Sequence, residues 1–119
     1  VNHGTNEARS GSPFFGVAPF NLTIAMTELL HLGVPLDKVV AMVTSNPARL
    51  IGMGNQIGSL QPGHDADISV LKIETGRFKL SDNSGVEVVS EQLVRPVLCL
   101  RAGEIIEADS PFIPDAIAA

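Results

Sequence analysis

The side chains that could do chemistry in this chain are few, and they lie far apart in the sequence. Its histidines are His3, His31 and His64, and its single cysteine is Cys99. A catalytic zinc site needs about three protein ligands that converge on one ion. Histidines at such distant positions give no reason to expect convergence. We therefore assign no metal ligand and no catalytic residue to this chain.

Two local pairs of side chains have spacings that metal sites use. Glu28 and His31 stand at positions i and i+3, as in carboxylate-bridged di-iron bundles, but those sites also need matching groups on other helices. Asp65 and Asp67 resemble part of a calcium loop, but no glutamate follows at the required spacing. We expect no ion at either pair, and we expect the two aspartates to cap a turn.

The remaining two candidates have ordinary interpretations. Cys99 lies inside an apolar run without a neighbouring base, a setting that favours packing over reactivity. His3 lies next to the N-terminus, where a side chain is usually exposed to solvent. Neither residue is assigned a functional role.

Composition excludes several classes of protein. The 119 residues contain 8 Lys and Arg against 13 Asp and Glu, which gives a formal charge of −5. Binding to a nucleic-acid backbone needs clustered positive charge, so we expect no nucleic-acid partner. No apolar run reaches the roughly 18 residues that span a bilayer, so we expect no membrane partner. A lone cysteine forms no intrachain disulfide, which favours the cytoplasm.

The size of the chain fits one ordinary globular domain, because 45% of its residues are hydrophobic and 18% are charged. A chain of this length buries a core without metals or disulfides. It starts at Val1 rather than at a methionine and shows no secretory signal pattern. The missing methionine indicates processing or a fragment.

The first half of the chain predicts a helical hairpin. Asn21 can cap the first helix, and Gly33 provides the left-handed residue that ends it. Between them, apolar residues recur at the spacing of one buried helical face: Leu22, Ala25, Met26, Leu29 and Leu30.

Two prolines organise the helices that follow. Pro35 fits the first position of a second helix, which runs to about Thr44. Asn46 can cap a third, short helix that Pro47 opens. We therefore expect helices from residue 20 to residue 52.

Strand patterns replace helical ones in the second half of the chain. Residues 67–73 and 93–100 are rich in β-branched and other apolar types. Pro96 has no N–H to donate to a ladder, so we expect it at an edge or a bulge. A tight turn near Gly103 predicts a hairpin into the last strand. Residues 57–107 should be mainly strand, and the fold class is α+β.

Several short motifs follow one another in a recognisable order: Thr44-Ser45-Asn46-Pro47-Ala48-Arg49, Ile51-Gly52, Ile57-Gly58-Ser59-Leu60-Gln61-Pro62-Gly63 and Ala66-Asp67-Ile68-Ser69-Val70. Together with the run from Pro19 to Leu36, they resemble the C-terminal segment of the amidohydrolase superfamily, a group of metal-dependent hydrolases. The resemblance covers about residues 14–106. It is strongest to the dihydroorotase-like amidohydrolase and deacetylase branch.

This resemblance implies a (β/α)8 barrel that holds divalent metal, most simply zinc, and is joined to a small β-domain. Residues 1–52 would form the end of the barrel, and residues 53–119 would supply C-terminal strands of the β-subdomain. The family's metal ligands would precede this segment, except for a last aspartate expected near residues 1–5. The sequence there reads Val1-Asn2-His3-Gly4-Thr5, so no ligand is transferred, and no metal is expected on this chain alone.

One polar stretch keeps a functional interpretation. Loops that follow barrel strands form the active-site face of such a barrel, and residues 6–12 would follow its last strand. Arg9 in this stretch could pair bidentately with a substrate carboxylate, which makes it our candidate substrate-binding residue. The alternative is a solvated loop.

The sequence thus predicts the C-terminal portion of a metal-dependent amidohydrolase. The whole enzyme would hydrolyse a non-peptide C–N bond in a small cyclic amide or N-acyl substrate, and this portion alone would be inactive. The alternative is a self-standing α+β module for interaction or oligomerisation. On this interpretation the helices would pack on barrel strands that are absent here, so we expect a homo-oligomer that covers their apolar residues. In a monomer these residues should face water: Leu22, Met26, Leu29, Val39 and Val43.

Overall fold

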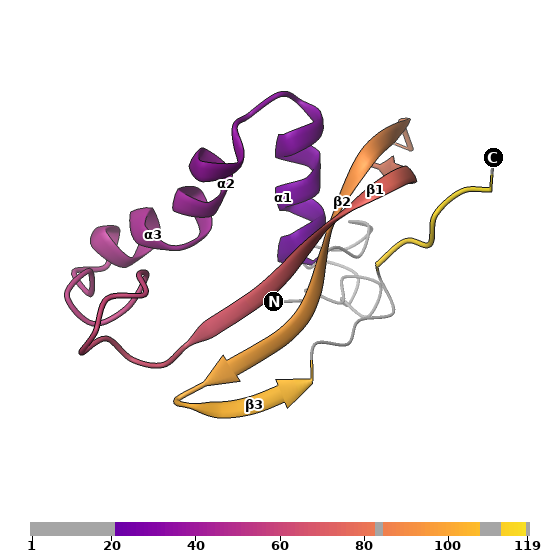
Figure 1. The fold of residues 1–119 in the computed structure, drawn as a ribbon. Coiled ribbons are helices and arrows are strands. Elements are labelled where there is room, and N and C mark those ends of the chain that lie inside the picture. Colours follow the sequence, from indigo (N-terminus) through magenta and orange to yellow (C-terminus); the bar gives the residue numbers. More distant parts are fainter. Residues whose placement is uncertain (1–20, 83–84, 108–112, 119) are drawn as a thin grey trace, which may run out of the picture.

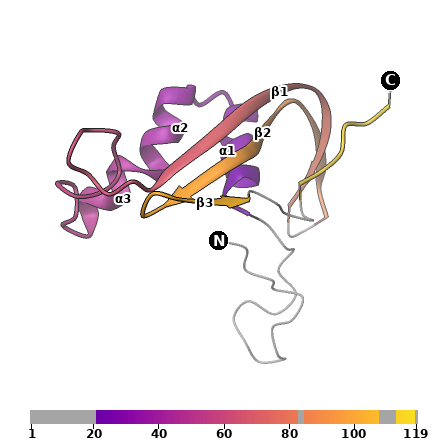
Figure 2. The ribbon, with the colours of Figure 1, turned by 60° about the horizontal axis from the view of Figure 1, so that its bottom comes forward.

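A computed structural model of the chain describes residues 21–82, 85–107 and 113–118. Three helices come first and three strands follow: α1 (Leu22–His31), α2 (Leu36–Val43), α3 (Ser45–Leu50), β1 (Ile68–Ser81), β2 (Glu87–Arg101) and β3 (Glu104–Glu107). Figures 1 and 2 show α1 and α2 beside one face of a long twisted ribbon made by β1 and β2. The fold class is α+β, as predicted.

Helix α1 has the ends that the sequence predicts. The Asn21 side-chain oxygen accepts a hydrogen bond from the Ile24 N–H at 2.9 Å, which satisfies one of the unpaired N–H groups of the first turn. At the other end, Gly33 has a φ of +89°, and its N–H donates to the Leu30 carbonyl at 3.0 Å. A glycine fits there because it has no Cβ to resist positive φ.

The break between α2 and α3 differs from the prediction in its position. Pro35 lies one residue before the first helical residue and acts as the N-cap of α2. The chain bends at Thr44, and α3 already includes Asn46 and Pro47. Asn46 does not cap the helix; its side-chain oxygen accepts from the Arg49 guanidinium at 2.6 Å. Pro47 is tolerated because N–H groups in a first helical turn have no partner within the helix.

The segment after α3 is a packed loop and not the strand expected from residue 57 onward, because the first ladder begins only at Ile68. Gly58 presses against α3 with a φ of +83°. A Cβ added to Gly58 would lie 2.7 Å from the Ala48 Cβ and 2.9 Å from the Thr44 carbonyl oxygen. Only glycine meets both demands at this position.

The three strands form one antiparallel sheet in the order β1-β2-β3. Val70 pairs with Leu98 and Leu71 pairs with Pro96, so β2 carries an extra residue between the two pairs. Pro96 therefore lies at a bulge, as predicted. The predicted hairpin between β2 and β3 is also present, with φ values of +49° at Ala102 and +80° at Gly103.

The buried core joins the helices to the sheet. Met26 of α1, Val39 of α2 and Val94 of β2 form one buried cluster. The expectation that Met26 and Val39 face water was wrong. Helix α1 packs on both β2 and α2, and the two side chains are buried where these elements meet. Leu29 and Val43 are partly buried against the same cluster. Of the five residues expected to be exposed, Leu22 is exposed, at 47%.

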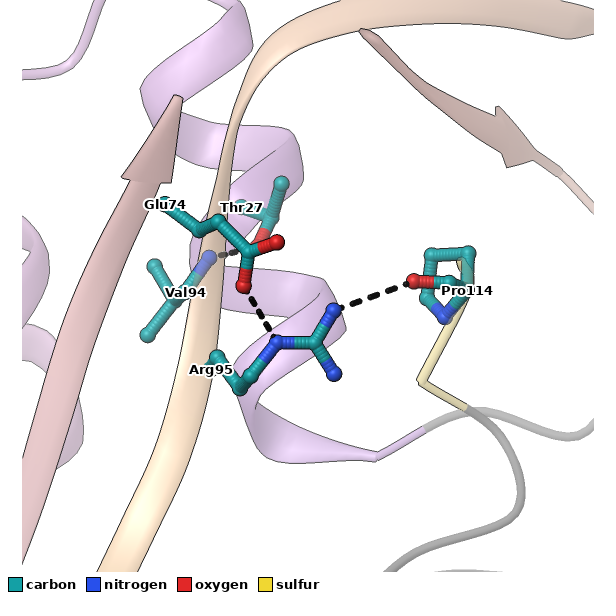
Figure 3. Close-up of polar contacts among 5 residues, drawn as sticks. All are labelled: Thr27, Glu74, Val94, Arg95 and Pro114. Atoms are coloured by element: carbon teal, nitrogen blue, oxygen red, sulfur yellow. Dashed lines mark hydrogen bonds and ion pairs between the residues drawn. The ribbon is translucent and has the colours of Figure 1, made fainter. Parts of the chain in front are cut away.

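A hydroxyl group fastens α1 to the sheet. The Thr27 side chain is fully buried, and its oxygen accepts a hydrogen bond from the Val94 N–H at 3.0 Å, as Figure 3 shows. The same hydroxyl donates to the Thr23 carbonyl at 2.8 Å. This arrangement satisfies a backbone N–H of β2 that would otherwise be buried without an acceptor.

Replacing Thr27 by valine should destabilise the fold without changing the volume of the side chain. Thr27→Val removes the acceptor of the Val94 N–H, so we expect the free energy of unfolding in urea to fall by about 1–3 kcal/mol. Thr27→Ser keeps the hydroxyl and loses one methyl group, so it should cost less, about 1 kcal/mol. Equal stability of Thr27→Val and the parent would contradict this role of the hydroxyl.

Candidate functional site

A polar hollow beside His31 lies between the end of α1 and the β1–β2 ribbon. Its volume is about 390 Å³. Its ionisable groups are His31 and Glu91. The buried Ser90 hydroxyl donates a hydrogen bond to the Gln92 carbonyl at 2.7 Å and accepts one from the Gln92 N–H at 3.3 Å. The hollow is lined by Leu30, His31, Thr75, Val89, Ser90, Glu91 and Gln92.

A serine and a histidine meet in the loop before β1. Ser59 Oγ lies 3.0 Å from His64 Nδ1, and the Gln61 N–H also reaches Ser59 Oγ at 3.4 Å. A serine beside a histidine is one component of nucleophilic catalysis. Here the contact spans five residues of one exposed turn, so its evident role is to hold the shape of the turn.

One of the two aspartates next to this turn, Asp67, holds backbone with its side chain. Asp67 Oδ1 accepts a hydrogen bond from the Ala102 N–H at 2.9 Å, and the Ala66 carbonyl accepts from the Gly103 N–H at 3.1 Å. The predicted capping role is therefore confirmed for Asp67. The turn that it caps is the distant β2–β3 hairpin and not a local one, so the start of β1 is tied to the tip of that hairpin.

No group of three or more His, Cys, Asp or Glu side chains comes together to hold a metal ion within residues 21–82, 85–107 and 113–118. The described residues therefore do not fit the metal centre that the resemblance implies. Arg9 and His3 lie outside the described residues. Cys99 is half-buried in β2, with its sulfur 3.8 Å from the Leu100 carbonyl oxygen.

Glu28 is the side chain whose ionisation the fold changes. Partial burial, and then the negative charge of Asp82, raise the pKa of the Glu28 carboxyl above its ordinary value. Both causes act against the charged form. Glu28 is thus a helix carboxylate whose charged form the fold disfavours, and His31 is the basic residue in the last turn of α1.

Sequence reasoning missed two polar features of this region. One is the Thr27 hydroxyl, and the other is the ion pair in which Arg95 Nε contacts Glu74 Oε2 at 2.5 Å. A threonine on an apolar helix face was the available signal for the first. The ion pair depends on the register that places Lys72 opposite Arg95, so that Glu74 lies diagonally across from Arg95.

Comparison with known proteins assigns the chain to a family. The model of the amidohydrolase family matches residues 4–108. This chain therefore belongs to the amidohydrolase family. None of the helices in the described part of the chain is long and apolar enough to cross a lipid bilayer.

Relatives with different names share this segment. A deacetylase of Enterococcus faecalis is 27% identical over 88 residues, which cover 74% of this chain and 24% of the relative. An imidazolonepropionase of Symbiobacterium thermophilum is 32% identical over 87 residues, covering 73% and 20%. A dihydroorotase of Pelotomaculum thermopropionicum is 41% identical over 80 residues, covering 60% and 18%.

Solved structures give the same result. An adenine deaminase matches with a TM-score of 0.70 and 27% identity, covering 75% of this chain and 24% of that protein. A dihydroorotase matches with a TM-score of 0.64 and 26% identity, covering 74% and 23%. The chain thus spans about a fifth to a quarter of the length of these relatives.

Removing the charge of Glu28 should stabilise the protein at neutral pH. A raised pKa in the folded state means that the folded chain binds the Glu28 proton more tightly than the unfolded chain does. The charged carboxylate therefore opposes folding at pH 7, and this penalty disappears as the pH falls through the raised pKa. We expect Glu28→Gln to have a higher Tm than the parent at pH 7.

The difference in Tm should shrink as both proteins are measured at lower pH. Glu104→Gln is the matched control, because it removes the same charge from an exposed position of β3. It should change the Tm at pH 7 less than Glu28→Gln does. A Glu28→Gln variant that is less stable than the parent at pH 7 would show that the carboxylate is favourable.

Proposed function

We propose that this chain is the C-terminal portion of a metal-dependent amidohydrolase that hydrolyses a non-peptide C–N bond in a small cyclic amide or N-acyl substrate. The observation that carries the proposal is the family match over residues 4–108. The likeness to an adenine deaminase and to a dihydroorotase supports it. The relatives differ in their names, so the proposal stays at the level of a bond type and not of one substrate.

The proposed architecture divides the chain at residue 52. Residues 1–52 would close the end of the barrel, and residues 53–119 would belong to the small β-subdomain. The packed loop between α3 and β1 supports a boundary there. The cluster of Met26, Val39 and Val94 holds the two parts together across it.

The catalytic metal, for which zinc is the simplest choice, would be held outside the described residues, because these bring no ligand set together. A metal of this kind activates water and polarises the bond that is cleaved. Arg9 remains the candidate that would bind a substrate carboxylate. A small-molecule substrate, no nucleic-acid or membrane partner, and a cytoplasmic location complete the proposal.

The 119-residue chain alone should bind zinc weakly and should not catalyse hydrolysis. We expect isothermal titration to give no stoichiometric Zn²⁺ binding in the submicromolar range, because isolated histidines supply too few ligands. Hydrolysis of dihydroorotate or of N-acyl amino acids should not exceed that in buffer. Tight stoichiometric binding that His31→Ala abolishes and His64→Ala spares would overturn the proposal and place a metal site at the end of α1.

We also propose that the chain forms a homo-oligomer. Within the described residues, 7 hydrophobic residues are buried, whereas 18 large hydrophobic residues are exposed. Such extensive apolar surface is typical of interaction sites. Part of it lies on the second and third helices and just beyond them, and we call this part the helix patch: Leu36, Val40, Met42, Leu50 and Ile51.

A charge in the helix patch should weaken association. We expect light scattering at tens of micromolar to give at least a dimer for the parent. Leu36→Glu should lower the mass, because it places a charge in the patch while an acidic residue in a first helical turn remains favourable. Gln61→Glu adds the same charge in the exposed loop and should leave the mass unchanged. A stable monomeric parent at this concentration would contradict the proposal.

A further inference from the structure

Strand β1 carries a bulge in the middle of its ladder with β2. Thr75 pairs with Gln92 and Phe78 pairs with Ser90, so Gly76 and Arg77 together face one residue of β2. A bulge of this kind interrupts the ladder and leaves backbone groups without a partner strand. Among the described residues, no strand other than β2 pairs with β1.

The end of the chain lies against this bulge. The Ile117 N–H donates a hydrogen bond to the Arg77 carbonyl at 2.7 Å. A Cβ built on Gly76 would lie 3.9 Å from the Ala116 Cβ, so the two backbones pass close to each other. We call residues 113–118 the C-terminal strap. The strap thus bonds to a backbone carbonyl of β1 at its bulge.

A side chain of the sheet provides a second anchor for the strap. Arg95 of β2 donates from Nη2 to the Pro114 carbonyl at 3.5 Å, as Figure 3 shows. Its Nε is held by Glu74 of β1 at 2.5 Å. Both side chains of this ion pair are about two-thirds buried, with relative exposures of 31% and 27%, so solvent and salt screen it less than a surface pair. Glu74 therefore orients the guanidinium toward the strap.

We propose that the C-terminal strap is an intramolecular guard that occupies the edge of β1 at its bulge and keeps a second copy of this chain from pairing there. An exposed strand edge is a template for pairing with another chain, and proteins often protect such an edge by covering it. The strap covers the edge without extending the sheet, because Pro114 has no N–H to offer to a further strand.

The guard is separate from the helix patch, and the experiment keeps the two apart. All proteins carry Leu36→Glu, which weakens association through the helices. A chain that ends at residue 112 is compared with the 119-residue chain by sedimentation velocity over a range of concentrations. We expect truncation to lower the concentration at which half of the chains are associated by about tenfold. The uncovered edge would gain one or two net hydrogen bonds to a second copy, and their free energy corresponds to a factor of this size.

Two point variants test the strap without shortening the chain. Ile117→Pro removes the N–H that bonds to Arg77, whereas Ile117→Ala keeps this N–H and shortens the side chain. We expect Ile117→Pro to increase association in the same direction as truncation, and Ile117→Ala to stay close to the parent. Circular dichroism establishes that each variant is folded.

The proposal is overturned if Ile117→Pro is folded and associates no more strongly than Ile117→Ala. This comparison decides the matter even if the truncated chain unfolds. A folded truncated chain with unchanged sedimentation would overturn the proposal as well. Neither result depends on whether the chain belongs to a working hydrolase, so the guard and the proposed function can fail separately.

Discussion

The attachment of α1 to β2 is the constraint on which the rest of this structure depends. Thr27 is buried, and its hydroxyl oxygen accepts a hydrogen bond from the Val94 N–H. This bond fixes the depth and rotation of α1 on the sheet, which in turn brings Met26 beside Val94. Helix α2 then adds Val39 to the same cluster. With seven buried hydrophobic residues in the described part of the chain, the loss of one such contact removes a large share of the core.

Features that depend on neighbouring residues could be predicted from the sequence. The Asn21 cap, the Gly33 stop and the turn at Gly103 each follow from the backbone preference of one residue type in a short context. The position of Pro96 at a bulge follows in the same way, because proline cannot donate to a ladder. The start of α3 was misplaced, because a proline in a first helical turn is compatible with more than one position of the break.

Features that depend on register could not be predicted in this way. Thr27 and Val94 are 67 positions apart in the sequence, and Arg95 and Glu74 are 21 positions apart. A shift of one residue in a strand turns every side chain to the other face, so no local pattern reveals such pairs. The candidate site shows the same limit. The candidate substrate-binding residue, Arg9, rested on the family resemblance alone.

The motifs that carried the family resemblance now have physical roles, and these roles explain what the motifs can and cannot reveal. Gly58 is needed because α3 leaves no room for a Cβ beside it. Asp67 is needed because its carboxylate holds the tip of the β2–β3 hairpin. Both residues join one element of the fold to another, and neither belongs to a metal-binding cluster among the described residues. Such joints hold the scaffold together, whatever bond an enzyme built on it cleaves. A segment of this kind therefore identifies the family, while the choice of substrate must reside in residues that these joints do not constrain.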